Sequence, residues 1–229
     1  MARLNVKDII EREAKAQARK DEWRSIYEDC YEFALPQRNL YSGYYEGGVP
    51  GKGKMARVFD STAIHATQRF ANRIQAGLFP PQKEWCRLEA GTGIPAQQQP
   101  QAQAALDAYT TRMFEIMRQT NFDLAMGEFL LDLCVGTAVM MVTPGDEVTP
   151  IRFTPIPQYL VAIEEGTFGN VDNVYRKLRM KAETIPQEFP DAEMTSELAQ
   201  AIEQSPSKEI DLMDAVIYDY ERAVYCYHV

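Results

Sequence analysis

Residues 59–88 set where one helix must begin and end. Asp60 precedes a run of apolar residues spaced three and four apart, and its carboxylate can accept hydrogen bonds from the free N–H groups of the first turn. Pro80 and Pro81 lack N–H donors, so the helix must stop near Phe79, and a Trp-containing strand is predicted to follow. The predicted apolar stripe consists of Ala63, Ala66, Thr67, Phe70, Ile74, Gly77 and Leu78.

The length and composition limit the kinds of protein that this chain can be. With 229 residues and 45% apolar content, it can bury one core, or a core and a smaller satellite, and Phe70 is expected in that core. No run approaches the ~20 apolar residues that span a bilayer, and residues 1–20 lack the apolar segment of a secretory signal. The scattered cysteines predict reduced, buried thiols in a cytosolic protein. These cysteines are Cys30, Cys86, Cys134 and Cys226.

Negative charge is concentrated near the end of the chain. Residues 183–221 carry eleven acidic side chains against the single Lys208, a net charge of −10, whereas the whole chain carries −9. An acidic surface repels the phosphate backbone, which argues against tight reading of duplex DNA. A solvated acidic face is the favoured interpretation.

Residues 5–35 read as one long helix that ends before Pro36. Its first half is polar, and apolar residues become frequent only toward its end. A helix of this length is too long for a small core alone, so we expect it to lie along a partner surface or to project from the body.

Residues 36–58 form a predicted loop rich in Gly, Tyr and Lys. Within it, Gly48–Lys54 is similar to a phosphate-binding loop, but Met55 stands where a Ser or Thr should hold magnesium, and Pro50 removes one N–H group. We therefore predict a basic surface loop and no nucleotide site. Three tyrosines of the loop suit either subunit contacts or a plain surface, and they are Tyr41, Tyr44 and Tyr45.

The remaining pattern predicts an α+β fold, with a long N-terminal helix and a helical segment followed by a mostly antiparallel β region. Two domains are expected, residues 1–58 and residues 59–229. The last strand continues to the final residue, which suggests a chain truncated at its C-terminus. After a linker at 90–103, the predicted helices are 102–119, 122–135, 181–189 and 193–203, and the predicted strands are 137–143, 149–155, 159–164, 171–180, 209–220 and 223–229.

The sequence contains no catalytic signature. The GxSxG, HExxH, GxGxxG and EF-hand patterns are absent. The only histidines are His65 and His228, which lie far apart in the chain, and His65 sits beside an apolar stripe where a structural role is favoured. We therefore expect no catalytic, cofactor-binding or metal site, and an enzyme is the weaker class.

Four sequence blocks follow one another in a characteristic order. The first two are a long helix ending in YEFALP, and FDSTA followed by a helix and AGLFPPQKEWCRLE. The next two are NFDLAMGEFLLDLCVGTAVMMV and PIPQYLVAIEEGTFGNVDNVYRKLRM. Each block alone is modest, whereas their order and spacing together are fairly specific, and in this order the chain resembles the portal (head-to-tail connector) proteins of short-tailed bacteriophages.

The resemblance implies a structural subunit of a ring, commonly of twelve copies, at one vertex of the capsid. Such a ring contacts the capsid protein, the packaging terminase and tail adaptor proteins, and DNA passes through it during packaging and ejection without sequence-specific binding. This chain would supply mainly the wing domain, without the stem and clip, and would be found in the virion and, during assembly, in the host cytoplasm. Two alternatives stay open: a generic protein-interaction module, and a nucleotide-binding enzyme that uses Gly48–Lys54.

Overall fold

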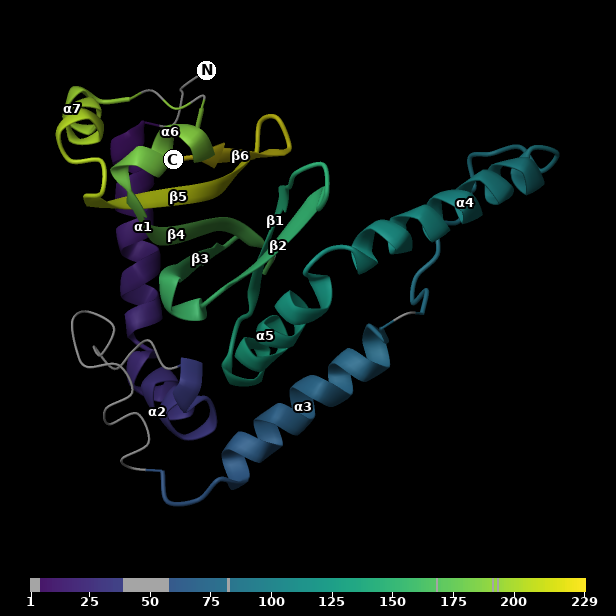
Figure 1. The fold of residues 1–229 in the computed structure, drawn as a ribbon, viewed down its shortest axis with the longest axis horizontal. Helices are drawn as coiled ribbons and strands as arrows, with labels where there is room; N and C mark the ends of the chain where they lie inside the picture. Colours follow the sequence, from purple (N-terminus) through teal and green to yellow (C-terminus); the bar gives the residue numbers. More distant parts are fainter. Residues whose placement is uncertain (1–4, 39–57, 82, 168, 191, 193) are drawn as a thin grey trace. The chain divides into compact units, whose positions relative to one another are not determined.

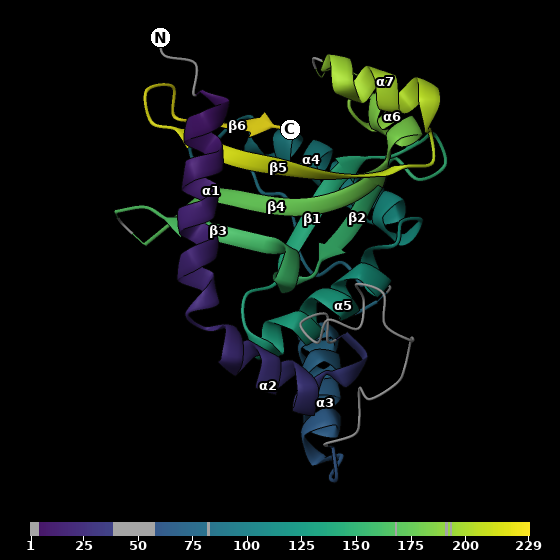
Figure 2. The same ribbon diagram turned by 90° about the vertical axis from the view of Figure 1, so that its left-hand side faces the viewer.

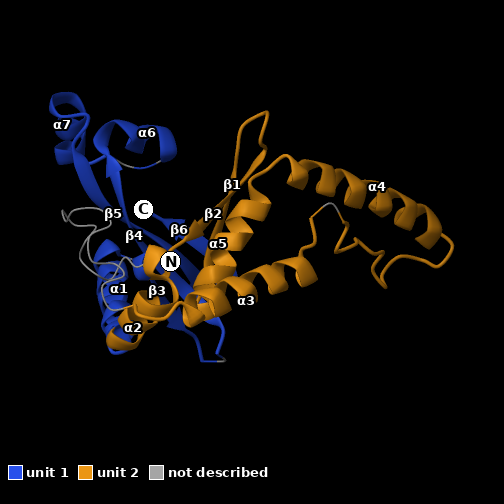
Figure 3. Cartoon of the chain, turned by 60° about the horizontal axis from the view of Figure 1, so that its bottom comes forward, with its two compact units in different colours: residues 1–24, 159–229 blue, residues 25–158 orange. Residues whose placement is uncertain are grey.

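The computed structural model describes residues 5–38, 58–81, 83–167, 169–190, 192 and 194–229. These residues form two compact units (Figure 3). Unit 1 contains the described residues of 1–24 and 159–229, and unit 2 those of 25–158. The α+β class predicted from the sequence is confirmed, with helices followed by antiparallel strands. The predicted division into 1–58 and 59–229 follows other bounds than these units and, as a division into folding domains, stays a prediction.

Unit 1 is built on a four-stranded antiparallel sheet with the strand order β3-β4-β5-β6 (Figure 1). Gly169, with a φ angle of 75°, lies in the reversal between β3 and β4, where a residue without a Cβ atom avoids strain. The strands are β3 (Val161–Glu165), β4 (Val171–Lys181), β5 (Glu209–Asp219) and β6 (Val224–His228), close to the predicted bounds. Because each strand pairs with its neighbour in sequence, β3 and β6 form the two edges of the sheet.

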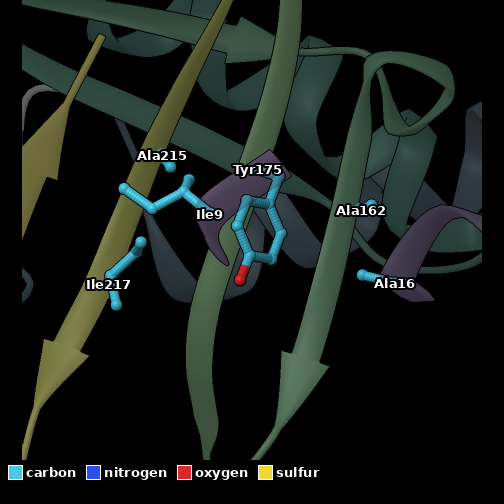
Figure 4. Packing of buried hydrophobic residues seen from close by; sticks show 6 residues of the cluster. All are labelled: Ile9, Ala16, Ala162, Tyr175, Ala215 and Ile217. Carbon is cyan, nitrogen blue, oxygen red and sulfur yellow. The ribbon is translucent and has the colours of Figure 1, made fainter. Parts of the chain in front are cut away.

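Helix α1 (Val6–Asp21) lies across one face of this sheet (Figure 2). It begins where the side chain of Asn5 accepts a hydrogen bond from the Lys7 N–H. The core between helix and sheet is small and tight, and Figure 4 shows the ring of Tyr175 at its centre. The buried apolar residues of this core are Ile9, Ala16, Ala162, Tyr175, Ala215 and Ile217.

Short helical elements join β4 to β5. They are η3 (Ala182–Thr184), α6 (Ile185–Glu188) and α7 (Ser196–Gln204), and they lie within a few residues of the helical stretches predicted at 181–189 and 193–203. The Ala182 N–H donates to the carbonyl of Lys208 at 2.9 Å, and this hydrogen bond joins the two ends of the connection between β4 and β5. Helix α7 begins at Thr195, whose hydroxyl accepts from the Leu198 N–H as an N-cap does.

Unit 2 is mostly helical, with α3 packed on α5 and α5 on a two-stranded hairpin (Figure 1). Its elements are α2 (Arg24–Ala34), η1 (Pro36–Arg38), α3 (Thr62–Leu78), α4 (Gln99–Arg118), α5 (Phe122–Val135), β1 (Val139–Pro144) and β2 (Ile151–Ile156), and η2 (Gln158–Leu160) follows where the units meet in sequence. Asp60 accepts hydrogen bonds from the N–H and the hydroxyl of Thr62, and α3 ends at Leu78, so the predicted start and stop are confirmed.

The hairpin between β1 and β2 follows from its turn residues. A Cβ atom at Gly145 would lie 1.8 Å from the carbonyl oxygen of Thr149, so only glycine fits there. The Asp146 carboxylate accepts from the N–H groups of Val148 and Thr149 at 2.9 and 2.6 Å, and these hydrogen bonds lower its pKa. The predicted turn and both strands are confirmed.

The prediction of one helix over 5–35 is wrong. The helix breaks after Asp21, where the Trp23 N–H bonds the carbonyl of Lys20 three residues back, and α2 begins at Arg24. Neither Gly nor Pro marks this break. Its reason is tertiary, because α1 packs in unit 1 and nearly all of α2 belongs to unit 2.

The expectation that this long helix projects from the body is wrong for α1, which packs on the sheet, whereas its alternative, a helix that lies along a partner surface, stays a prediction. Helix α1 needs only a narrow stripe to pack on the sheet, formed by Ile9, Glu13 and Ala16 at spacings of four and three. Glu13 is buried beside its partner Lys177, whose Nζ lies 3.1 Å from the carboxylate. A charged residue can therefore occupy the buried stripe when the sheet supplies its counter-ion.

Two further expectations from the sequence are corrected. Phe70 is 40% exposed and lies outside the core, because α3 packs on α5 through a stripe that includes Thr67 and Ala71. The residues after the prolines form no sheet, and 84–90 instead runs along α4. The cysteines are free but not fully buried, and Cys86 is exposed. No helix among the described residues is long and apolar enough to cross a membrane.

Candidate interaction surfaces

The residues first considered for chemistry do not assemble into a site. His65 is exposed on α3 and His228 lies on β6. Among the described residues, no group of His, Cys, Asp and Glu is placed to hold a metal ion. Gly48–Lys54 and the tyrosines at 41, 44 and 45 lie outside the described residues. What the structure does present is a set of surfaces and the polar networks that stiffen them.

The acidic strand β5 is partly neutralised by the basic strand β4. Arg179 lies opposite Asp211 and bonds its carboxylate at 2.6 Å. On the other face of the sheet, Arg176 lies opposite Asp214 and forms a two-pronged pair with it, with Nε at 2.9 Å from Oδ1. The acidic residues of β5 are therefore ordered as cross-strand pairs and not merely solvated.

Asp214 also ties the edge strand to the sheet. The Tyr227 hydroxyl donates to Asp214 Oδ2 at 2.9 Å, so one buried carboxylate joins β4, β5 and β6. Burial of Tyr227 and its hydrogen bond to a carboxylate raise its pKa to about 12. This network holds β6 in register although its outer side is an edge of the sheet.

Tyrosines gather on the face of the sheet that α1 does not cover. The rings of Tyr220 and Tyr225 each lie 4.9 Å from the ring of Tyr218, and Tyr225 also donates to the Val171 carbonyl at 3.2 Å. Tyr220, Tyr225 and Tyr227 are each more than half exposed. The tyrosine cluster, defined as Tyr218, Tyr220, Tyr225 and Tyr227, is of the residue type that protein interfaces favour.

A second surface lies on α4 of unit 2, where residues 84–90, here called the edge segment, run along the helix (Figure 1). The Leu88 N–H donates to Thr110 Oγ1 at 3.1 Å, and its carbonyl accepts from Gln103 Nε2 at 3.0 Å. Two positions further, the Ala90 N–H donates to Gln103 Oε1 at 3.1 Å. Side chains of α4 thus take the place of a neighbouring strand.

An aromatic cluster anchors the start of the edge segment. The ring of Trp85 lies 5.4 Å from that of Phe114 on α4 and stacks at 6.0 Å on Phe122 of α5. Phe79, at the end of α3, and Phe153, on β2, complete the cluster. These five rings come from five parts of unit 2, so they fix the segment against its helical body.

Beside the edge segment is an open, mainly polar groove of about 550 Å³. Arg87 spans it, and its Nε and Nη2 each lie 2.8 Å from the Asp107 carboxylate. Gln103 adds a third donor to Asp107, and these hydrogen bonds lower the pKa of that carboxyl. Two charged groups of the groove, Arg87 and Asp107, thus pair with each other, and the third, Glu84, accepts from the Thr111 hydroxyl at 3.2 Å.

Sequence reasoning missed these surfaces for identifiable reasons. The charge pairs had a readable signal, because β4 and β5 both carry charges at alternate positions that match in an antiparallel register. The aromatic cluster had none, since its five rings are scattered between residues 79 and 153.

Comparison with known proteins supplies the wider context for these surfaces. A family model described as bacteriophage head to tail connecting protein matches residues 6–225, almost the whole chain. No curated protein matches the chain. The match spans both compact units and includes the edge segment and the first two residues of β6.

Proposed function

The chain belongs to the family of bacteriophage head to tail connecting proteins, and from this premise we propose that it is one subunit of a portal ring at the capsid vertex. The single observation that carries the proposal is the family match over residues 6–225. A connector between head and tail is a structural component of the virion. The ordered blocks of sequence described above favour the portal type within this family.

In the proposed ring, identical copies surround a channel, and DNA passes through it during packaging and ejection. A dodecamer is the number that the portal resemblance favours. The net charge of −9 supports a role in which DNA is not held, because an acidic surface repels phosphates. We propose that this chain performs no catalysis and that a separate packaging motor supplies the work.

The proposed partners are further copies of the chain, the capsid protein, the packaging terminase and tail adaptor proteins. The surfaces that support contacts of this kind are the tyrosine cluster and the edge segment with α4. Both expose groups that are typical of protein interfaces, with aromatic rings on one and unpaired peptide groups on the other.

Two measurements test the proposal. Native mass spectrometry of the purified protein is expected to show one closed oligomer, and electron microscopy of particles from the encoding phage is expected to place it at a single vertex. A phage with the gene interrupted is expected to give heads without DNA. DNA-filled heads in that experiment, or absence of the protein from the particle, would overturn the proposal.

A further inference from the structure

We infer that the edge segment of one copy pairs as an antiparallel strand with the free edge of β6 in the next copy. The inference rests on the proposed ring and adds the contact that would link its subunits. It starts from the edge segment and the outer side of β6, two extended segments that have no strand paired to that side among the described residues. One lies in each compact unit, so each copy could offer an edge at two different places.

The first free edge belongs to the edge segment. The Leu88 and Ala90 peptides are bonded to α4, and in an extended chain the groups of alternate residues point to the same side. The peptide groups of Trp85, Arg87 and Glu89 therefore point away from α4. Within the described part of the chain, no hydrogen bond reaches them.

The path along α4 shows that the edge segment is extended. Its contacts run from Phe114, next to Trp85, back to Gln103, next to Ala90. The eleven steps along the helix from Gln103 to Phe114 span ~16 Å at ~1.5 Å each. The five steps from Trp85 to Ala90 cover the same length only at ~3.3 Å each, which is the rise of a β-strand.

The second free edge belongs to β6. It pairs with β5 on one side, and no strand lies on its other side among the described residues. Edge strands in monomeric proteins are commonly protected by charges, prolines or bulges. This one carries no Lys, Arg, Asp, Glu or Pro over 224–228. An unprotected edge of this kind is typical of β-strand addition.

The side chains select one register, in which Cys86 lies opposite Cys226. Leu88, which is 41% exposed, then lies opposite Val224, which is 46% exposed, so that each covers the other. Arg87 lies opposite Tyr225, an arrangement that suits a cation–π contact. A shift by one residue would turn these side chains to opposite faces and lose the match.

The backbone agrees with this register. Because the free peptide groups belong to odd-numbered residues, Trp85 and Arg87 would form the hydrogen-bonded pairs with Tyr227 and Tyr225. Cys86 and Cys226 would then form a non-hydrogen-bonded pair, in which Cα atoms are ~4.5 Å apart and side chains are closest. Such a pair is near the separation that a disulfide needs.

The contact is heterologous, since it joins two different parts of the chain. Each subunit gives one edge and receives another, so repeated contacts form a ring when the rotation closes. An isologous dimer would use one edge twice and leave the other free. The pairing is therefore of the kind that a ring of identical subunits requires.

Oxidative cross-linking of the assembled protein tests the pairing. Diamide takes up the two electrons and two protons released when two thiols become a disulfide. The expected product is a reducible ladder of covalent multimers on a non-reducing gel, with a Cys86–Cys226 peptide identified by mass spectrometry. Cys86→Ser and Cys226→Ser should each abolish the ladder, whereas a Cys30→Ser, Cys134→Ser double variant should keep it.

A charge exchange tests the same register without cysteine chemistry. Leu88→Lys and Val224→Asp should each raise the concentration at which the oligomer half-dissociates by about tenfold or more, because each places a charge opposite an apolar partner. Combining them in one chain should restore assembly. Leu133→Lys, at an apolar position on α5 that is 42% exposed, is the matched control and should leave assembly unchanged.

The outcomes separate this inference from the proposed function. Closed oligomers without a Cys86–Cys226 cross-link would overturn the strand pairing and leave the ring standing. A protein that stays monomeric at every concentration would overturn both. A Cys86–Cys226 disulfide within a single chain, seen as a monomer band of altered mobility, would overturn pairing between copies.

Discussion

The side-chain amide of Asn121 forms hydrogen bonds with both the N–H and the carbonyl of Phe153. Its Nδ2 donates to the Phe153 carbonyl at 2.6 Å, and its Oδ1 accepts from the Phe153 N–H at 3.0 Å. Asn121 stands at the N-cap position of α5 without forming a side-chain cap bond. It instead fastens the start of α5 to β2 and so joins helix and hairpin in unit 2.

Loss of this amide should weaken unit 2. We expect Asn121→Ala to lower the free energy of unfolding by about 1–2 kcal/mol, because two exposed hydrogen bonds contribute modestly each. Asn121→Asp keeps only the accepting oxygen, so its free energy of unfolding should lie between those of Asn121→Ala and the parent protein. Urea denaturation measures both, with Asn72→Ala on α3 as the exposed control. Equal stability of Asn121→Ala and the parent would contradict the prediction.

The buried ion pair of Arg38 and Asp132 should contribute far more to the free energy of unfolding than the exposed pair of Arg87 and Asp107. Asp132 is 1% exposed and accepts from Arg38 at 2.7 and 3.1 Å and from the Tyr31 hydroxyl at 3.2 Å. We expect Asp132→Ala to cost about 3–5 kcal/mol of unfolding free energy, because it leaves a largely buried guanidinium without its main partner.

The matched control has the same geometry in an exposed setting. Asp107 accepts two hydrogen bonds from Arg87, and both side chains are well exposed. Asp107→Ala should therefore lower the free energy of unfolding far less than Asp132→Ala does. Chemical denaturation measures both variants. Equal losses of unfolding free energy in Asp132→Ala and Asp107→Ala would contradict the prediction that burial decides the size of the effect.

The aromatic cluster should depend on Phe122, which contacts Phe79, Trp85 and Phe153 and is almost fully buried. Phe122→Ala is expected to cost about 3–5 kcal/mol through lost burial and the cavity left behind. Phe70→Ala removes the same side chain from a 40% exposed site and should cost clearly less. Thermal and urea unfolding of both variants measure which substitution lowers the stability more, and a larger loss in Phe70→Ala would contradict the prediction.

Lys20 should make stability depend on pH. Its ammonium group donates to the Tyr159 carbonyl at 2.7 Å, and burial lowers its pKa from 10.5 to about 8. Between these values the unfolded chain holds the proton that the folded chain has lost. The unfolding free energy therefore rises with pH in this window, and below it Lys20 adds no slope.

Replacing Lys20 by Met should flatten that slope. Urea titrations at several pH values between 8 and 10 measure it, and an unchanged slope in Lys20→Met would contradict the assignment. The window stops at pH 10 because Tyr227 acts with the opposite sign. Its pKa is raised from 10.0 to about 12, so its contribution to stability is lost as the pH rises between those values.

Local signals in the sequence were sufficient for several elements. The α5 bounds, the β1–β2 hairpin and the four strands of the larger sheet lie within a few residues of their predicted positions. Gly145 and Asp146 act on their nearest neighbours, and the two prolines after α3 act on their own peptide groups. Such effects do not depend on distant residues, so a pattern in the sequence reveals them.

Tertiary structure decided what those local signals left open. The break between α1 and α2 has no local breaker and follows from the division of its two halves between units. Phe70 lies on an apolar stripe yet stays exposed, because the packing of α3 on α5 uses a neighbouring stripe. The polar α1 became a core helix because Lys177 supplies a partner for Glu13.

The sequence by itself determined the α+β class, the order of the elements and the family to which the chain belongs. Only the tertiary structure decided which polar residues could be buried, which aromatic rings meet and which strand edges are left unpaired within the described part of the chain. The physical reason is that turns and periodicity act over a few neighbouring residues, whereas burial and pairing depend on residues that only folding brings together.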